Sequence, residues 1–132
     1  IEHALRCGQT QDPALALVAT GFGYGADRRA AQAELLTKLL PNVRDIRRIG
    51  AAALDLCRVA EGTVDAYFEH GINAWDFAAG AIIAREAGAV VRHPGFDKGS
   101  ADGELTWAAG ADLAPAFEKL LAAHTVTDAL RG

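Results

Sequence analysis

Glu69 and Asp76 have the side chains and the spacing best suited to chemistry, because both are carboxylates and they flank one turn. A strand should end at Glu69, the chain should turn at Gly71, and a helix should begin at Trp75. Carboxylate oxygens are ligands that Mg²⁺ prefers, and they also accept hydrogen bonds from sugar hydroxyls. In α/β folds, ligands bind in the crevice at the carboxyl ends of strands. The pair therefore indicates a site for a divalent cation, a polyol, or both.

Asp76 also has a simpler interpretation, as an acid in the first turn of a helix. Such an acid is stabilised by about 0.3–1 kcal/mol through the helix dipole, and it can accept hydrogen bonds from free N–H groups. However, the segment 75–84 is apolar on every side except at Asp76, so we expect this helix to be buried almost all round. An unpaired buried carboxylate costs roughly several kcal/mol. Asp76 should therefore be paired, either with backbone N–H groups or with a cation.

Strand-like and helix-like segments alternate along the chain. Strands are expected over residues 15–20, 43–47, 64–68, 89–93 and 105–109, and helices over 27–40, 51–61, 75–87 and 113–123. The inner face of the first helix should carry Ala30, Ala33, Leu36, Leu39 and Leu40. This alternation predicts a layered α-β-α domain, with a mostly parallel sheet of about five strands and helices on both faces. Residues 1–132 fit a single domain of this kind.

Composition excludes several classes of function. The net charge is −4 and no basic run is present, so nucleic acid is not an expected partner. No run of about 18 apolar residues exists, so we expect no membrane span. Cys7 and Cys57 belong to no motif and are interpreted as reduced thiols, Cys57 in the core of its helix. A cytoplasmic protein is therefore predicted. Because the chain begins at Ile1 and contains no methionine, we expect it to be a piece of a longer protein.

A glycine-containing loop offers a second hypothesis. The pattern Gly21-x-Gly23-x-x-Ala26 lies between an expected strand and an expected helix, and it satisfies a minimal dinucleotide-binding fingerprint. Asp45 follows at about the distance of a ribose-binding acid. Asp27, however, would lie close to a bound phosphate and repel it. The alternative is that this loop is a flexible turn between strand and helix.

Several motifs resemble the C-terminal half of inositol monophosphatase family enzymes. They are the segment Arg48–Glu69, Gly71, Trp75-Asp76-Phe-Ala-Ala-Gly80 and Glu86-Ala-Gly88, with Thr20-Gly21-Phe22 at the place of the family's Thr-Gly-Phe. The resemblance runs from about Leu15 to the last helix. It favours this family over the dinucleotide-binding interpretation of the Gly21 loop.

The resemblance implies a Mg²⁺-dependent phosphomonoesterase that acts on an inositol phosphate or a related compound. The residue matching Asp76 would be a metal ligand that also contacts the substrate, and the residue matching Glu69 would bind an inositol hydroxyl. Gly50, Ala51 and Ala52 match residues that line the sugar pocket at a helix start. A helix start with small side chains is physically suitable there, because ring hydroxyls need close approach to the backbone.

One departure from the family is large. The family's upstream glutamate and its Asp-Pro-x-Asp-Gly-Thr motif are absent, and Asp12-Pro13 is not followed by Asp-Gly-Thr. No catalytic residue is therefore assigned in this fragment, which we expect to be inactive without the missing N-terminal half. The resemblance also implies a homodimer. A hypothesis of another class is a non-catalytic module that serves for association.

Overall fold

The computed structural model describes residues 4–130. Its strands are β1 (Leu17–Thr20), β2 (Asp45–Arg47), β3 (Ala66–His70), β4 (Ala89–Arg92) and β5 (Leu105–Gly110). Its α-helices are α1 (Ala26–Leu39), α2 (Ala52–Glu61), α3 (Ala74–Glu86) and α4 (Ala114–Ala123), and three short 3₁₀ turns are η1 (Pro13–Leu15), η2 (Leu40–Asn42) and η3 (Ser100–Asp102). Every expected helix and strand is present in the expected order, with boundaries that differ by a few residues.

The five strands form one sheet in the order β2-β1-β3-β5-β4. β1 pairs in parallel with both β2 and β3, whereas β5 is antiparallel to its neighbours β3 and β4. Four strands therefore run in one direction and β5 runs in the other. The structure confirms the mostly parallel five-stranded sheet, with one reversed strand that the hydrophobic pattern could not distinguish.

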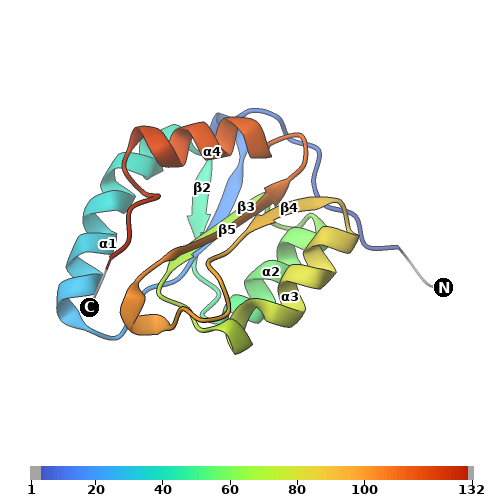
Figure 1. Cartoon of the computed structure of the whole chain (residues 1–132). Helices are drawn as coiled ribbons and strands as arrows, with labels where there is room; N and C mark the ends of the chain where they lie inside the picture. Colours follow the sequence, from blue (N-terminus) through green and yellow to red (C-terminus); the bar gives the residue numbers. More distant parts are fainter. Residues whose placement is uncertain (1–3, 131–132) are drawn as a thin grey trace.

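Helices cover both faces of this sheet, as predicted (Figure 1). α2 and α3 pack on one face through Leu56, Val59, Phe77 and Ala81 against strand residues such as Tyr67. α1 and α4 cover the other face through Leu35, Leu39, Phe117 and Leu121, against strand residues such as Phe68 and Trp107. Because strand side chains alternate between faces, Tyr67 and Phe68 belong to different cores. The result is a three-layered α-β-α arrangement.

Strand β3 lies two residues further along the chain than the expected 64–68. Glu69 and His70 belong to the strand because they pair with Thr106 and Leu105 of β5. The Asp65 carboxylate instead accepts the Leu17 N–H at 2.8 Å, and this bond ties the start of β3 to β1. β3 lies between β1 and β5, and the pairing of Glu69 with Thr106 of β5 fixes the direction of its side chain.

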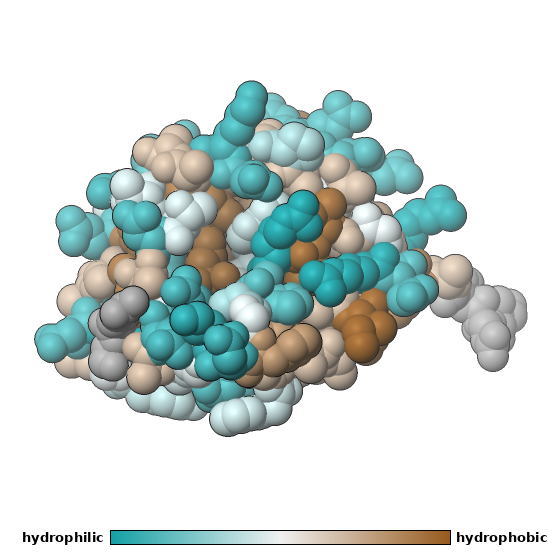
Figure 2. Space-filling model, in the orientation of Figure 1, coloured by the Kyte–Doolittle hydropathy of each residue, from teal (hydrophilic) through white to brown (hydrophobic). Residues whose placement is uncertain are grey.

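The expectation that α3 is buried almost all round is wrong. Phe77 and Ala84 are fully buried, but the Trp75 side chain is 79% exposed and Ile82 is 63% exposed. The reason is that the sheet and α2 cover only one side of this helix. Leu54 of α2 is also exposed, and Figure 2 shows apolar surface on the side of the molecule where α3 lies.

Among the described residues, no helix is both long enough and apolar enough to cross a membrane.

Gly80 allows α3 to pack closely against α2. A Cβ atom at this position would lie 2.8 Å from both Cβ and Cδ1 of Leu56. We expect Gly80→Ala to lower the free energy of unfolding by about 1–3 kcal/mol, because overpacking outweighs the gain in helix propensity. Urea denaturation followed by circular dichroism measures this change. The loss caused by Gly80→Ala should be smaller in a Leu56→Ala background than in the parent, because alanine removes the Cδ1 contact and leaves only the Cβ contact. Strictly additive effects would contradict the proposed clash with Leu56 Cδ1.

Candidate functional site

A cleft of about 930 Å³ opens at the carboxyl ends of β1, β2 and β3, where α1, α2 and α3 begin. It is lined by residues 21–28, 50–53, 69–73 and 100–101, together with Arg48, Trp75 and Asp76. In α/β sheets this edge is the usual place for ligands, because loops and helix N-termini converge there. The size is sufficient for a small-molecule ligand.

All of the site residues predicted from the sequence line this one cleft. Gly50 has a φ of +96°, a conformation that glycine adopts without strain, and it turns the chain into α2. Ala51 is the N-cap residue of α2 and makes no side-chain capping bond. Gly50, Ala51 and Ala52 therefore present a helix N-terminus with little side-chain bulk to the cleft. Such a surface can donate backbone N–H groups to a hydroxyl or an anion.

Glu69 is half-buried at the end of β3 and is oriented by Tyr67. The Tyr67 hydroxyl donates to Oε1 of Glu69 at 2.8 Å, and both side chains lie on the same face of the strand. Burial raises the pKa of Glu69 above its ordinary value, while the Tyr67 hydrogen bond and the Arg48 charge act in the opposite direction. Sequence reasoning did not identify Tyr67, although its position two residues before Glu69 on a strand was a usable signal.

Gly21 leaves room for the carboxylate of Glu69. A Cβ atom at Gly21 would lie 2.6 Å from Cδ and 2.8 Å from Oε2 of Glu69, so any side chain there would collide with the carboxylate. A side chain at this position would displace the Glu69 carboxylate from its bond with Tyr67.

Asp76 caps α3 and faces the cleft. Its Oδ2 accepts the backbone N–H of Asn73 at 3.0 Å, so the expected role as a helix-capping acid is present. Asn73 Oδ1 in turn accepts the backbone N–H of Ser100 at 2.8 Å. This chain of bonds fixes the start of α3 against the η3 segment, and both segments line the cleft.

The side chains at the cleft do not form a metal site by themselves. Among residues 4–130, no group of three or more His, Cys, Asp or Glu side chains could hold a metal ion. Mg²⁺ needs a nearly octahedral set of oxygen ligands. Asp76 can offer one carboxylate, and Glu69 is already bonded to Tyr67. A magnesium site here would need further ligands from outside the chain.

Asp55 is a buried carboxylate that sequence reasoning overlooked. It is fully buried on the inner face of α2, and neither of its oxygens has a hydrogen-bond partner in the described part of the chain. Burial, together with the negative charge of Glu69, raises the pKa of Asp55 from 3.8 to about 7, although Arg48 opposes this. Asp55 shares the inner stripe of the helix with Leu56 and Val59. That 3.6-residue spacing was the signal available in the sequence.

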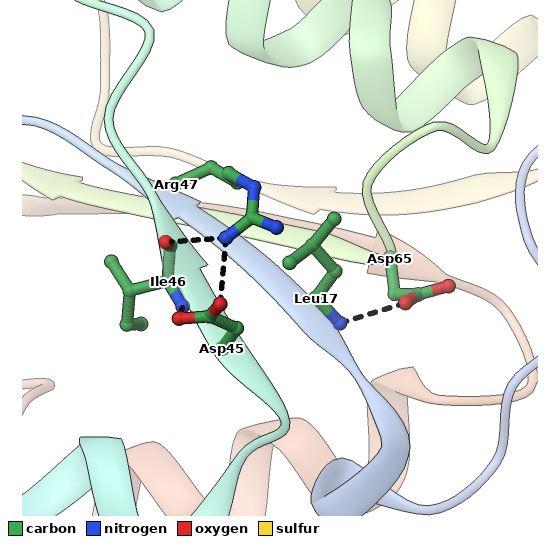
Figure 3. A network of polar contacts seen from close by, with 5 residues as sticks. All are labelled: Leu17, Asp45, Ile46, Arg47 and Asp65. Carbon is green, nitrogen blue, oxygen red and sulfur yellow. Dashed lines mark hydrogen bonds and ion pairs between the residues drawn. The ribbon is translucent and has the colours of Figure 1, made fainter.

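Asp45 lies away from the cleft. It is the first residue of β2 and pairs with Leu17 at the start of β1, whereas the Gly21 loop follows the other end of β1. Its carboxylate binds Arg47 at 2.8 Å and the Ile46 N–H at 2.7 Å (Figure 3). The interpretation of Asp45 as a ribose-binding acid is therefore wrong. Parallel pairing with β1 places Asp45 at the amino ends of the strands, whereas the cleft lies at their carboxyl ends.

Comparison with known proteins agrees with this geometry. The model of the inositol monophosphatase family matches residues 2–129. An inositol-1-monophosphatase from Mycobacterium leprae is 60% identical over 92 residues, which cover 70% of this chain and 32% of that protein. The solved structure of SuhB from Mycobacterium tuberculosis superposes with a TM-score of 0.85 at 46% identity, covering 96% of this chain and 49% of that chain. A protein named Nus factor SuhB from Pasteurella multocida is 47% identical over 88 residues, which cover 66% of this chain and 33% of that protein.

This chain therefore belongs to the inositol monophosphatase family. The resemblance seen in the sequence is confirmed. The matching region spans about a third of the length of the M. leprae and P. multocida relatives and about half of the M. tuberculosis structure.

Proposed function

We propose that this chain is the C-terminal part of a Mg²⁺-dependent phosphomonoesterase that acts on an inositol phosphate or a related sugar phosphate. The observation that supports this proposal is that Glu69, Asp76 and the N-terminus of α2, which carries only small side chains, line the same cleft. Membership of the inositol monophosphatase family supports the reaction class. The name of the M. leprae relative, inositol-1-monophosphatase, supports the substrate class.

In this proposal the chain holds the alcohol part of the substrate. The Glu69 carboxylate, oriented by Tyr67, accepts a hydrogen bond from a ring hydroxyl. Free backbone N–H groups at Ala51 and Ala52 donate to another hydroxyl, because no side chain covers them. Asp76 supplies one Mg²⁺ ligand. When bound, Mg²⁺ would supply Lewis-acid chemistry at the phosphate.

We further propose that the remaining metal ligands belong to an N-terminal half that packs against α2 and α3. Exposed apolar side chains at Leu54, Trp75, Ile82 and Ile83 support this position, because a free face of this kind commonly marks an interface. Without that half the chain should be inactive, since Asp76 alone cannot hold the metal. A homodimer, the absence of a nucleic-acid partner and a cytoplasmic location remain predictions. The name of the P. multocida relative, a Nus factor, shows that not every relative is named as a phosphatase.

Restoring the N-terminal half tests the proposal. The half can be taken from the M. leprae relative, which is 60% identical in the shared region. We expect the joined protein, but not this chain alone, to hydrolyse myo-inositol 1-phosphate in a Mg²⁺-dependent manner. Glu69→Gln should raise KM about tenfold, because the amide keeps one acceptor oxygen but loses the charge-assisted bond.

Glu118→Gln is the matched control for the Glu69 variant, because Glu118 is an exposed residue of α4 on the other face of the sheet. This control should leave KM unchanged. Equal kinetics for Glu69→Gln and the parent would show that Glu69 does not bind substrate. A joined, folded protein without Mg²⁺-dependent activity on any phosphomonoester would refute the proposed function.

A further inference from the structure

Gln32 is a buried polar residue of α1 that the proposed function does not use. It is only 5% exposed and lies in the second turn of the helix, which begins at Ala26. Because a helical side chain leans toward the N-terminus of its helix, Gln32 reaches back to the loop that joins β1 to α1. A buried amide needs hydrogen-bond partners, so its contacts indicate which part of the chain it holds.

Gln32 holds the Gly21 loop at two points. Its Oε1 accepts the Gly23 N–H at 2.9 Å. Its Nε2 donates to the Gly21 carbonyl at 3.5 Å, which is a long and weak bond. One partner is a donor and the other is an acceptor, and a primary amide offers both functions in a single group. The bond to Gly23 is therefore the main tie, and the bond to Gly21 adds to it.

Other side chains tie this loop less firmly or at its edge. Thr20 Oγ1 donates to the Phe68 carbonyl at 2.7 Å, which fixes the end of β1 against β3 just before the loop begins. Arg29 Nη1 donates to the Gly23 carbonyl at 3.2 Å, but this bond is exposed and water can replace it. Among the described residues, Gln32 is therefore the buried side chain that secures the loop itself.

The Gly21 loop forms one wall of the space that holds the Glu69 carboxylate. A Cβ atom at Gly21 would lie 2.6 Å from Cδ and 2.8 Å from Oε2 of Glu69, so the loop backbone lies directly against this group. The Tyr67 hydroxyl donates to Oε1 of the same carboxylate at 2.8 Å. A carboxylate that is bonded to a hydroxyl and also touches the backbone cannot turn freely. A loop that moved away would allow it to rotate.

We propose that Gln32 is a positioning residue for Glu69. By holding the Gly21 loop in place, it fixes the direction in which the Glu69 carboxylate accepts a hydrogen bond from the substrate. Gln32 does not line the cleft, so it can act on a ligand only through the loop. This inference rests on the proposed role of Glu69 in binding a substrate hydroxyl. Gln32 should therefore affect the binding of the substrate more than the rate of its hydrolysis.

Gln32→Met tests this role in the protein joined to the N-terminal half of the M. leprae relative. Methionine has a similar length but cannot bond to the loop. We expect KM for myo-inositol 1-phosphate to rise about fivefold, whereas kcat should change by less than about twofold. In a Glu69→Gln background the same change should raise KM by less than about twofold, because the bond that depends on the loop is already weakened. Equal increases of KM in the two backgrounds, or a fall in kcat alone, would overturn the proposal.

Leu39→Val is the matched control for loss of stability. Leu39 is only 2% exposed and is the last residue of α1, at the end of the helix away from the Gly21 loop. This variant should unfold at a lower urea concentration than the parent but keep its KM. If Leu39→Val raised KM as much as Gln32→Met, the effect would come from a weakened fold and the proposed role of Gln32 would be wrong.

Nuclear magnetic resonance of the 132-residue chain tests the inference without any need for activity. The side-chain carboxyl carbon signal of Glu69 should shift in Gln32→Met and stay in place in Leu39→Val. An unchanged Glu69 signal in Gln32→Met would contradict the proposal. A joined protein that is inactive with every variant would count against the proposed function, whereas the Glu69 signal would still report on Gln32.

The parent chain provides a further test that does not depend on any variant. The Gly23 amide should be protected from hydrogen exchange at least about tenfold more than the amide of Gly25, because Gln32 binds Gly23 whereas Gly25 is exposed in the same loop. Equal protection of the two amides would show that Gln32 does not hold the loop. This result would overturn the proposal even if Gln32→Met failed to fold.

Discussion

Asp76→Asn is expected to lower kcat/KM for myo-inositol 1-phosphate by more than about a hundredfold in the protein joined to the N-terminal half of the M. leprae relative. Asparagine has nearly the same shape and keeps one oxygen, so it can still accept the Asn73 N–H that Asp76 accepts at 3.0 Å. The charge that a magnesium ligand needs is lost. Activity should therefore fall while the helix cap and the fold are retained.

Two further measurements separate metal binding from folding. Raising the Mg²⁺ concentration should recover part of the activity of Asp76→Asn, and its free energy of unfolding should stay within about 1 kcal/mol of the parent. Asp112→Asn, a change at an exposed residue just before α4, should alter neither quantity. If Asp76→Asn kept full activity with an unchanged dependence on Mg²⁺, Asp76 would be a helix cap and nothing more.

The largest effect on stability is expected for Asp55→Asn, and it should depend on pH. Burial and the charge of Glu69 raise the pKa of Asp55 from 3.8 to about 7 in the folded chain, so the folded state holds a proton that the unfolded state has already released. Stability should therefore fall as the pH rises from about 4 to about 7 and then level off. A difference of this size corresponds to about 4 kcal/mol. Asp55→Asn removes the ionisation and should be more stable than the parent by up to that amount at about pH 8.

Urea denaturation of the parent and the variant across this pH range measures the effect. The difference between the two proteins isolates Asp55 from other groups that titrate. Burial also raises the pKa of Glu69, so Glu69 lowers the stability of the fold as the pH rises, as Asp55 does. Burial lowers the pKa of His70, so His70 lowers the stability of the fold as the pH falls. Asp112→Asn serves again as the control and should follow the parent at every pH. A constant difference between Asp55→Asn and the parent from acid to alkaline pH would show that folding does not shift the pKa of Asp55, and it would contradict this prediction.

The features of the fold that depend on hydrophobic periodicity could be predicted from the sequence. The alternation of strands and helices, the helices on both faces and the family are confirmed. The direction of β5 was not predictable, because an apolar strand has the same pattern in either direction. The proposed site residues were placed by a motif, and the structure brings them into one cleft. Their chemical roles remain predictions.

The failures concern which side of a helix faces the core. Of the residues expected on the inner face of the first helix, Leu39 is buried as predicted, but Ala30, Ala33 and Leu40 are exposed and Leu36 is half-buried. The structure buries Arg28, Gln32 and Leu35 instead. In α2, Leu54 is exposed and Asp55 is buried, and Cys57 is half-buried instead of lying in the core. Hydrophobicity alone selected the wrong stripe, since buried polar groups at a ligand cleft break the usual rule. Arg28 and Asp55 escaped notice for this same reason.

The reversed strand β5 also dictates the order in which the molecule can assemble. β5 lies between β3 and β4 in the sheet but follows both of them in the chain. While the ribosome is still synthesising the chain, β2, β1 and β3 can pair as soon as they emerge, but β4 has no strand beside it until residues 105–110 appear. β4 and β5 must then join the sheet together, and β4 completes the cover over the inner face of α3, part of which already packs on α2. Completion of this sheet is therefore a late event that needs nearly the whole domain, and a nascent chain stopped before β5 would expose the apolar core to aggregation.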